Sequence, residues 1–147
     1  DSYGYTTFWP SRIASPKIGL WPEYPGNFDF VVADTARALA FYRYLLGMRP
    51  DRARPDLGYP GAWLQAGTRQ LHLLELPNPD PVTGRPGHGG RDRHVALLVD
   101  DIAALRARLE AAGVACTASR SGRPALFCRD PDGNAVELIQ QAAVDRA

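Results

Sequence analysis

The stretch RHVALLVDDIAALRARLEAAG, residues 93–113, predicts a buried strand followed by a short helix. Residues 94–99 are almost all apolar, as is typical of a strand inside a sheet. Asp101 is a favourable residue for a helix N-cap, and Leu105 and Leu109 recur at helical spacing before Gly113 ends the pattern. The stretch therefore predicts one β-α unit.

The same order of signals occurs earlier in the chain. NFDFVVAD, residues 27–34, alternates like a strand, and Asp34 precedes the helical pattern TARALAFYRYLLG, which ends at Gly47. Strand-like segments follow both helices: residues 48–54, 61–66 and 69–76 in the first half, and 114–119, 123–129 and 134–140 in the second. A repeat of this kind indicates a duplicated module. We therefore predict an α+β fold with two tandem βαβββ modules, residues 27–84 and 85–147. Together they form one curved, cup-shaped mixed sheet around a central cavity.

Residues 1–26 have a different composition, with four prolines and several aromatic residues. Prolines at this density oppose long helices and central strands, so we predict an irregular arm that packs on the domain or on a partner subunit. Cys116 and Cys128 flank the predicted turn at residues 121–124 and could be cross-strand neighbours. We favour two free thiols, because the N-terminal residues lack the pattern of a secretory signal.

The overall composition excludes several classes of partner. The chain has 147 residues and a net charge of +1, with 45% hydrophobic and 22% charged residues. This balance does not favour binding to nucleic acid or to an anionic membrane surface. No apolar run approaches the ~20 residues that a membrane-spanning helix needs. We therefore expect a cytoplasmic protein with a small-molecule partner.

Strand alternation places three chemically active side chains on the side of the sheet away from the helices. Leucine or valine residues on the same strands should face the helices, so His72, His94 and Glu137 should point into the cavity. Two imidazoles and a carboxylate suit a divalent ion such as Fe, Mn, Ni or Zn, with coordination positions left open for a substrate. In the alternative interpretation, the histidines are hydrogen-bonded core residues and Glu137 pairs with an arginine.

Four stretches carry a family resemblance: VVADTARALAFYRYLLG, GAWLQAGTRQLHLLELPNP, GRDRHVALLVDD and GRPALFCRDPDGNAVELIQ. The chain resembles the vicinal oxygen chelate superfamily, which includes glyoxalase I, bleomycin-resistance proteins, fosfomycin-resistance enzymes and extradiol dioxygenases. The resemblance implies a metal at the centre of the cup, with ligand positions at Asn27, His72, His94 and Glu137. Asn27 departs from the family pattern, in which metal-binding members usually carry histidine, and an amide oxygen is a poor ligand for the softer divalent ions.

Two functions follow from this resemblance. The first is a divalent-metal-dependent, glyoxalase- or dioxygenase-like enzyme in which Glu137 is catalytic and the substrate is a small, acidic, oxygen-chelating molecule. The second is a metal-free binding protein of the bleomycin-resistance type, which Asn27 and the aromatic arm favour. A homodimer is expected from the family. Candidate substrate-binding residues are Trp63, Gln65, Arg120 and Arg123.

Overall fold

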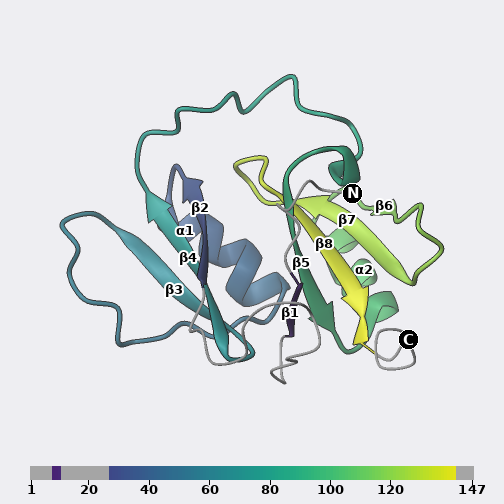
Figure 1. Cartoon of the computed structure of the whole chain (residues 1–147), viewed down its shortest axis with the longest axis horizontal. Helices are drawn as coiled ribbons and strands as arrows, with labels where there is room; N and C mark the ends of the chain where they lie inside the picture. The colour runs from purple at the N-terminus through teal and green to yellow at the C-terminus, as the bar shows by residue number, and fades with distance from the viewer. Residues whose placement is uncertain (1–7, 11–26, 142–147) are drawn as a thin grey trace.

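The structure is a computed structural model that describes residues 8–10 and 27–141. Within these ranges the chain forms two open sheets with helices packed against them (Figure 1). The first module contains β2 (Asn27–Val32), α1 (Thr35–Leu39), η2 (Ala40–Leu45), β3 (Gly61–Ala66) and β4 (Arg69–Glu75). The second contains η3 (Gly89–Arg91), β5 (His94–Val99), α2 (Ile102–Ala111), β6 (Thr117–Ala118), β7 (Ala125–Arg129) and β8 (Ala135–Gln140).

The sheets confirm the predicted α+β class and show how the strands are divided. One sheet has three strands in the order β2-β4-β3, and the other has five in the order β1-β5-β8-β7-β6. The short strand β1 (Phe8–Pro10) pairs in parallel with β5. It belongs to the stretch predicted to be an irregular arm, and the rest of that stretch lies outside the described residues. The two modules therefore present two open, curved sheets rather than one closed barrel.

The two modules share the register of their first and last strands. In the first module β2 runs parallel to β4, with Asn27 opposite Gln70 and Asp29 opposite His72. In the second module β5 runs parallel to β8, with His94 opposite Ala135 and Ala96 opposite Glu137. His72 and Glu137 therefore occupy equivalent positions in the two sheets, as do Asn27 and His94.

Both helices begin and end at the predicted residues. The side chains of Asp34 and Asp101 accept hydrogen bonds from backbone N–H groups three residues later, at 3.1 and 3.0 Å. Gly47 and Gly113 follow the helices with φ angles of 80° and 82°, a conformation that costs glycine little and other residues more. The first helix differs from a regular α-helix, because residues 40–45 form a π-helical turn.

Two of the predicted strands are wrong in extent. Residues 48–54 do not form a strand; they contribute only an isolated bridge between Pro50 and Leu64. Pro50 has no N–H to donate to a ladder, and Pro55 follows closely, so the segment cannot pair along its length. The predicted strand at 114–119 is reduced to the two residues of β6.

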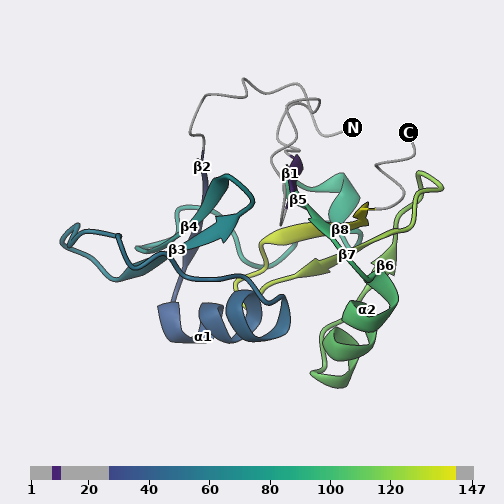
Figure 2. The same ribbon diagram turned by 90° about the horizontal axis from the view of Figure 1, so that it is seen from below.

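The main core lies between the helices and one face of the two sheets. Figure 2 shows both helices on the same side of the strands. Leu71, Leu73, Leu97 and Leu138 are all under 5% exposed and belong to one cluster with Leu109 of α2. In the part of the chain that the structure describes, no helix is both long and apolar enough to cross a bilayer. Cys116 and Cys128 are free thiols, as predicted.

The turn between β7 and β8, residues 130–134, connects the two modules. The buried Tyr42 hydroxyl donates to Asp130 Oδ2 at 2.8 Å. Asp132 Oδ1 accepts from the backbone N–H of Ala33 at 3.0 Å and from the guanidinium of Arg37 at 2.8 Å. These bonds attach the helix of the first module to the turn from which β8 begins.

Candidate functional site

His94 and Glu137 form a buried pair on the face of the second sheet that lies away from α2. They come from the neighbouring strands β5 and β8, and are 6% and 2% exposed. Nε2 of His94 lies 3.4 Å from Oε1 of Glu137. The sequence-based alternation therefore predicted correctly that the strand neighbours of this pair, Leu97 and Leu138, would pack in the main core.

The hydrogen bonds of His94 fix its tautomer. Nδ1 lies 2.8 Å from the carbonyl oxygen of Asp92, and because a carbonyl only accepts, Nδ1 must carry a proton. Nε2 faces the carboxylate of Glu137, to which it donates a hydrogen bond when the ring is protonated. Burial lowers the pKa of His94, but the hydrogen bonds to Glu137 and to the carbonyl of Asp92 outweigh it, so the net pKa is raised.

Charged groups surround this pair. Arg123 Nη2 lies 3.4 Å from Oε2 of Glu137, so one carboxylate oxygen faces the imidazole and the other a guanidinium. The side chain of Asp92, which precedes β5, pairs with Arg85 and Arg129 at 2.8 Å each. Burial alone would raise the pKa of Asp92, but the hydrogen bonds from Arg85 and Arg129 lower it to about 2. This network holds the backbone carbonyl that orients His94.

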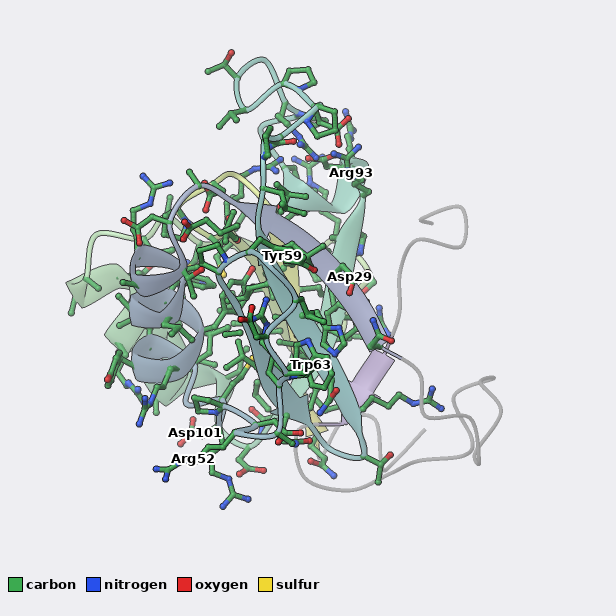
Figure 3. The ribbon with its side chains drawn as sticks, turned by 90° about the vertical axis from the view of Figure 1, so that its left-hand side faces the viewer. Asp29, Arg52, Tyr59, Trp63, Arg93 and Asp101 are labelled. Carbon is green, nitrogen blue, oxygen red and sulfur yellow. The ribbon has the colours of Figure 1, made fainter. Side chains whose placement is uncertain are left out.

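His72 lies on the other sheet, at the position equivalent to Glu137. Its ring stacks on Trp63, with centroids 4.4 Å apart and planes 7° from parallel. Trp63 and Asp29 lie on the side of this sheet away from α1 (Figure 3), and both are opposite His72 in the strand ladders. Trp63, one of the candidate substrate-binding residues, therefore supports an imidazole.

Both ring nitrogens of His72 are hydrogen-bonded. The amide of Gln70 donates to Asp51 Oδ2 at 2.6 Å, so its oxygen faces Nε2 of His72 at 2.9 Å and that nitrogen donates. Nδ1 accepts from the amide of Asn27 at 3.3 Å. Burial lowers the pKa of His72, so the neutral ring with its lone pair on Nδ1 is favoured. Gln65, also predicted to bind substrate, donates to Asp51 at 3.0 Å.

The structure brings together two of the three predicted metal ligands. Among the described residues, no three His, Cys, Asp or Glu side chains form a group that could hold an ion, because His72 is on a different sheet from His94 and Glu137. The pair itself suits a metal, since it offers one imidazole lone pair and one carboxylate. Metal-ligating histidines commonly donate their other N–H to a backbone carbonyl, as His94 does.

The prediction from sequence did not include the surroundings of Phe127. Its ring makes edge contacts with both His94 and His88, with centroids 5.0 and 4.9 Å apart. His88 lies on a glycine-rich loop and is half-buried. The sequence feature that could have indicated this contact is the run of glycines beside His88, because a Cβ at Gly90 would lie 3.2 Å from the Phe127 ring. These glycines allow the loop to approach the strand.

Comparison with known proteins agrees with this architecture. A family model described as the Glyoxalase/Bleomycin resistance protein/Dioxygenase superfamily matches residues 25–138. "Glyoxylase I 4" from Arabidopsis thaliana is 28% identical over 106 residues, which cover 69% of this chain and 61% of the relative, so the chain spans less than two thirds of that protein. "Uncharacterized protein YaeR" from Escherichia coli (strain K12) is 32% identical over 128 residues, 78% of this chain and 94% of the relative.

A solved structure shows the same similarity in three dimensions. The antibiotic binding protein TnmS3 from Streptomyces sp. CB03234 is 27% identical and superposes with a TM-score of 0.59. The superposition covers 80% of this chain and 95% of that one, and so includes both modules.

Proposed function

Because the chain belongs to the glyoxalase/bleomycin resistance protein/dioxygenase superfamily, we propose that it acts on a small acidic molecule with a divalent ion held by His94 and Glu137. The observation that carries this proposal is the orientation of His94. Its Nδ1–H is fixed by the carbonyl of Asp92, so Nε2, which lies 3.4 Å from a carboxylate oxygen of Glu137, is the nitrogen that can bind an ion once it is deprotonated. These are two ligands of the kind that Fe, Mn, Ni and Zn accept.

The side chains around the ion have separate roles in this proposal. A bound divalent ion supplies Lewis acidity that polarises an oxygen of the substrate. Glu137 is the catalytic residue, because its carboxylate is buried beside His94 and can accept a proton from the substrate. Arg123 contacts the same carboxylate, is 44% exposed, and can also reach an acidic group that enters from solvent.

A third protein ligand is proposed to come from a second copy of the chain. His72 is equivalent in register to Glu137 but lies on the other sheet. Within one copy of the chain it therefore does not join His94 and Glu137. We propose a homodimer in which the first sheet of one copy faces the second sheet of the other. Trp63 and Gln65 then line the same ligand space. Light scattering tests this directly, and a monomer at all concentrations would contradict it.

Metal content is the decisive experiment for the enzymatic proposal. Protein purified without chelator and supplemented with Mn, Fe(II), Ni or Zn is expected to retain about one ion per chain. His94→Ala and Glu137→Gln should each weaken metal binding by at least about tenfold. Glu110→Gln is the matched control, because this exposed carboxylate lies on α2 and pairs there with Arg106. Equal binding by Glu137→Gln and wild type would contradict the proposal.

A specific observation favours the second candidate, a metal-free binding protein. Arg123 lies 3.4 Å from Glu137, so the buried carboxylate is balanced by a cation of the chain itself. The similar protein TnmS3 is an antibiotic binding protein. In this case the chelator-treated protein should bind a bleomycin-type antibiotic, detected through tryptophan fluorescence, with the same affinity as untreated protein. Loss of binding after chelation would exclude this second function.

A further inference from the structure

A hollow of about 640 Å³ lies next to the candidate site in the second module. His88 and Arg91 line one side of it, from the loop and short helix that precede β5. Thr117 and Arg120 line the other side, from β6 and the turn that follows. Segments about thirty residues apart in the sequence therefore place two guanidinium groups and one imidazole around a common space.

The two arginines of the hollow differ from their neighbours in their ion pairs. Arg85 and Arg93 of the same loop pair with Asp92 and Asp80. Arg91 and Arg120 are exposed, and neither forms an ion pair with any residue in the described ranges 8–10 and 27–141. Their charge is therefore available to a ligand, whereas the charge of the other two arginines is already balanced.

His88 joins the hollow to the candidate site. Its Nδ1 lies 3.0 Å from the hydroxyl of Thr117, which fixes the ring against the wall. The His88 ring also makes an edge contact with Phe127, whose ring in turn contacts His94. Burial lowers the pKa of His88, and the charges of Arg120 and Arg91 lower it further, which indicates a positive potential at the imidazole.

We propose that this hollow binds the dianionic phosphate or phosphonate group of the molecule whose other end reaches His94 and Glu137. This inference rests on the proposed function for that other end. Each guanidinium presents a planar pair of N–H donors that matches two oxygens of an anion. A tetrahedral dianion has enough oxygens to satisfy both arginines, whereas a carboxylate satisfies one of them. Phe127, which contacts both His88 and His94, lies between the anion and the reacting pair in this arrangement.

Titration with inorganic phosphate, followed by NMR at fixed low ionic strength, tests the proposal without knowledge of the full ligand. The side-chain resonances of His88 should shift on binding. Replacing both arginines, Arg91→Gln with Arg120→Gln, should weaken phosphate binding by at least about tenfold, because charge-assisted hydrogen bonds are lost. Arg93→Gln is the matched control. It removes one positive charge from the loop that carries Arg91, and its side chain is 48% exposed and paired with Asp80.

The outcomes separate this proposal from the metal-dependent function. Glu137→Gln should keep phosphate binding while it loses the metal, so failure of one function leaves the other measurable. Three results would each overturn the inference: equal phosphate affinity in the double variant, an equal loss in Arg93→Gln, or resonances of His88 that do not respond. Acetate bound as tightly as phosphate would overturn the preference for a dianion. Melting curves should coincide, because all three substituted arginines are exposed.

Discussion

The hydrogen bond between Tyr42 and Asp130 should stabilise the contact between the two modules. Tyr42 is fully buried, and its hydroxyl donates to Asp130 Oδ2 at 2.8 Å. Tyr42→Phe removes only this oxygen and keeps the edge contact of the ring with Phe41, whose centroid is 4.9 Å away. A hydrogen bond to a charged partner contributes about 1.5–3 kcal/mol, so the free energy of unfolding should fall by about that amount.

The pH dependence of this effect has a definite sign. Burial raises the pKa of Asp130 above its ordinary value, although the hydrogen bonds from Asn134 and Tyr42 oppose the change. Protonation of Asp130 therefore favours the folded state, and this contribution is lost as the pH rises through the folded-state pKa. Tyr42→Phe removes a donor that stabilises the carboxylate. Its cost should be largest at neutral pH and smaller in acid, where the carboxyl is neutral.

Urea unfolding and thermal melting measure this effect. We expect the Tm to fall by about 4–10 °C at neutral pH. Tyr44→Phe is the matched control on the same helix, since Tyr44 is 65% exposed and its loss of a hydroxyl should change stability by less than about 0.5 kcal/mol. The reasoning is refuted if the two substitutions cost the same. It is also refuted if Tyr42→Phe is equally costly when Asp130 is already replaced by alanine, which has no side-chain oxygen to accept from the hydroxyl.

Three other properties should follow from individual side chains. Asp92→Asn should remove about 2 kcal/mol of stability at neutral pH, and the difference from wild type should vanish as the pH falls from 3.8 to about 2, because the lowered pKa of Asp92 stabilises the fold only above that window. Asp101→Ala should reduce the free energy of unfolding by about 1 kcal/mol through loss of the α2 N-cap bond. A thiol reagent at mildly alkaline pH should label Cys116 before Cys128, because burial raises the pKa of Cys128 to about 12.

Each of these three expectations has a result that contradicts it. Urea titrations of Asp92→Asn that run parallel to wild type down to acid pH would mean that the pairs with Arg85 and Arg129 contribute nothing. An unchanged unfolding midpoint for Asp101→Ala would show that another group replaces the cap. Simultaneous labelling of both cysteines would indicate that the second sheet opens locally before the reagent reacts.

Local chemistry was sufficient to predict most of the fold. Asp34 and Asp101 mark helix starts because a short carboxylate satisfies free N–H groups, and this needs no tertiary information. Alternation along a strand is also local, and it assigned His72 and Glu137 to the sheet faces opposite the core. The prediction of a strand at residues 48–54 was wrong, because Pro50 has no N–H to donate and the segment keeps only an isolated bridge to Leu64.

The candidate site was less predictable because it depends on distances between strands far apart in the sequence. The repeat showed that His72 is equivalent to Glu137, but equivalence across two sheets does not place the side chains together. The contact between Arg123 and Glu137 was considered only as a general alternative, since nothing local to either residue selects the other. The role of the Asp92 carbonyl is a backbone interaction, which residue types do not reveal.

The turn at residues 130–134 joins the first module to the strand that carries Glu137. Asp130 and Asp132 accept hydrogen bonds from the first module, and β8, the strand that carries Glu137, starts immediately after this turn. A change in the tilt between the two modules should therefore displace the start of β8. A ligand that contacts both sheets should therefore reduce the motion of this turn. Slower amide hydrogen exchange at Asp132 and Asn134 on ligand binding would show this.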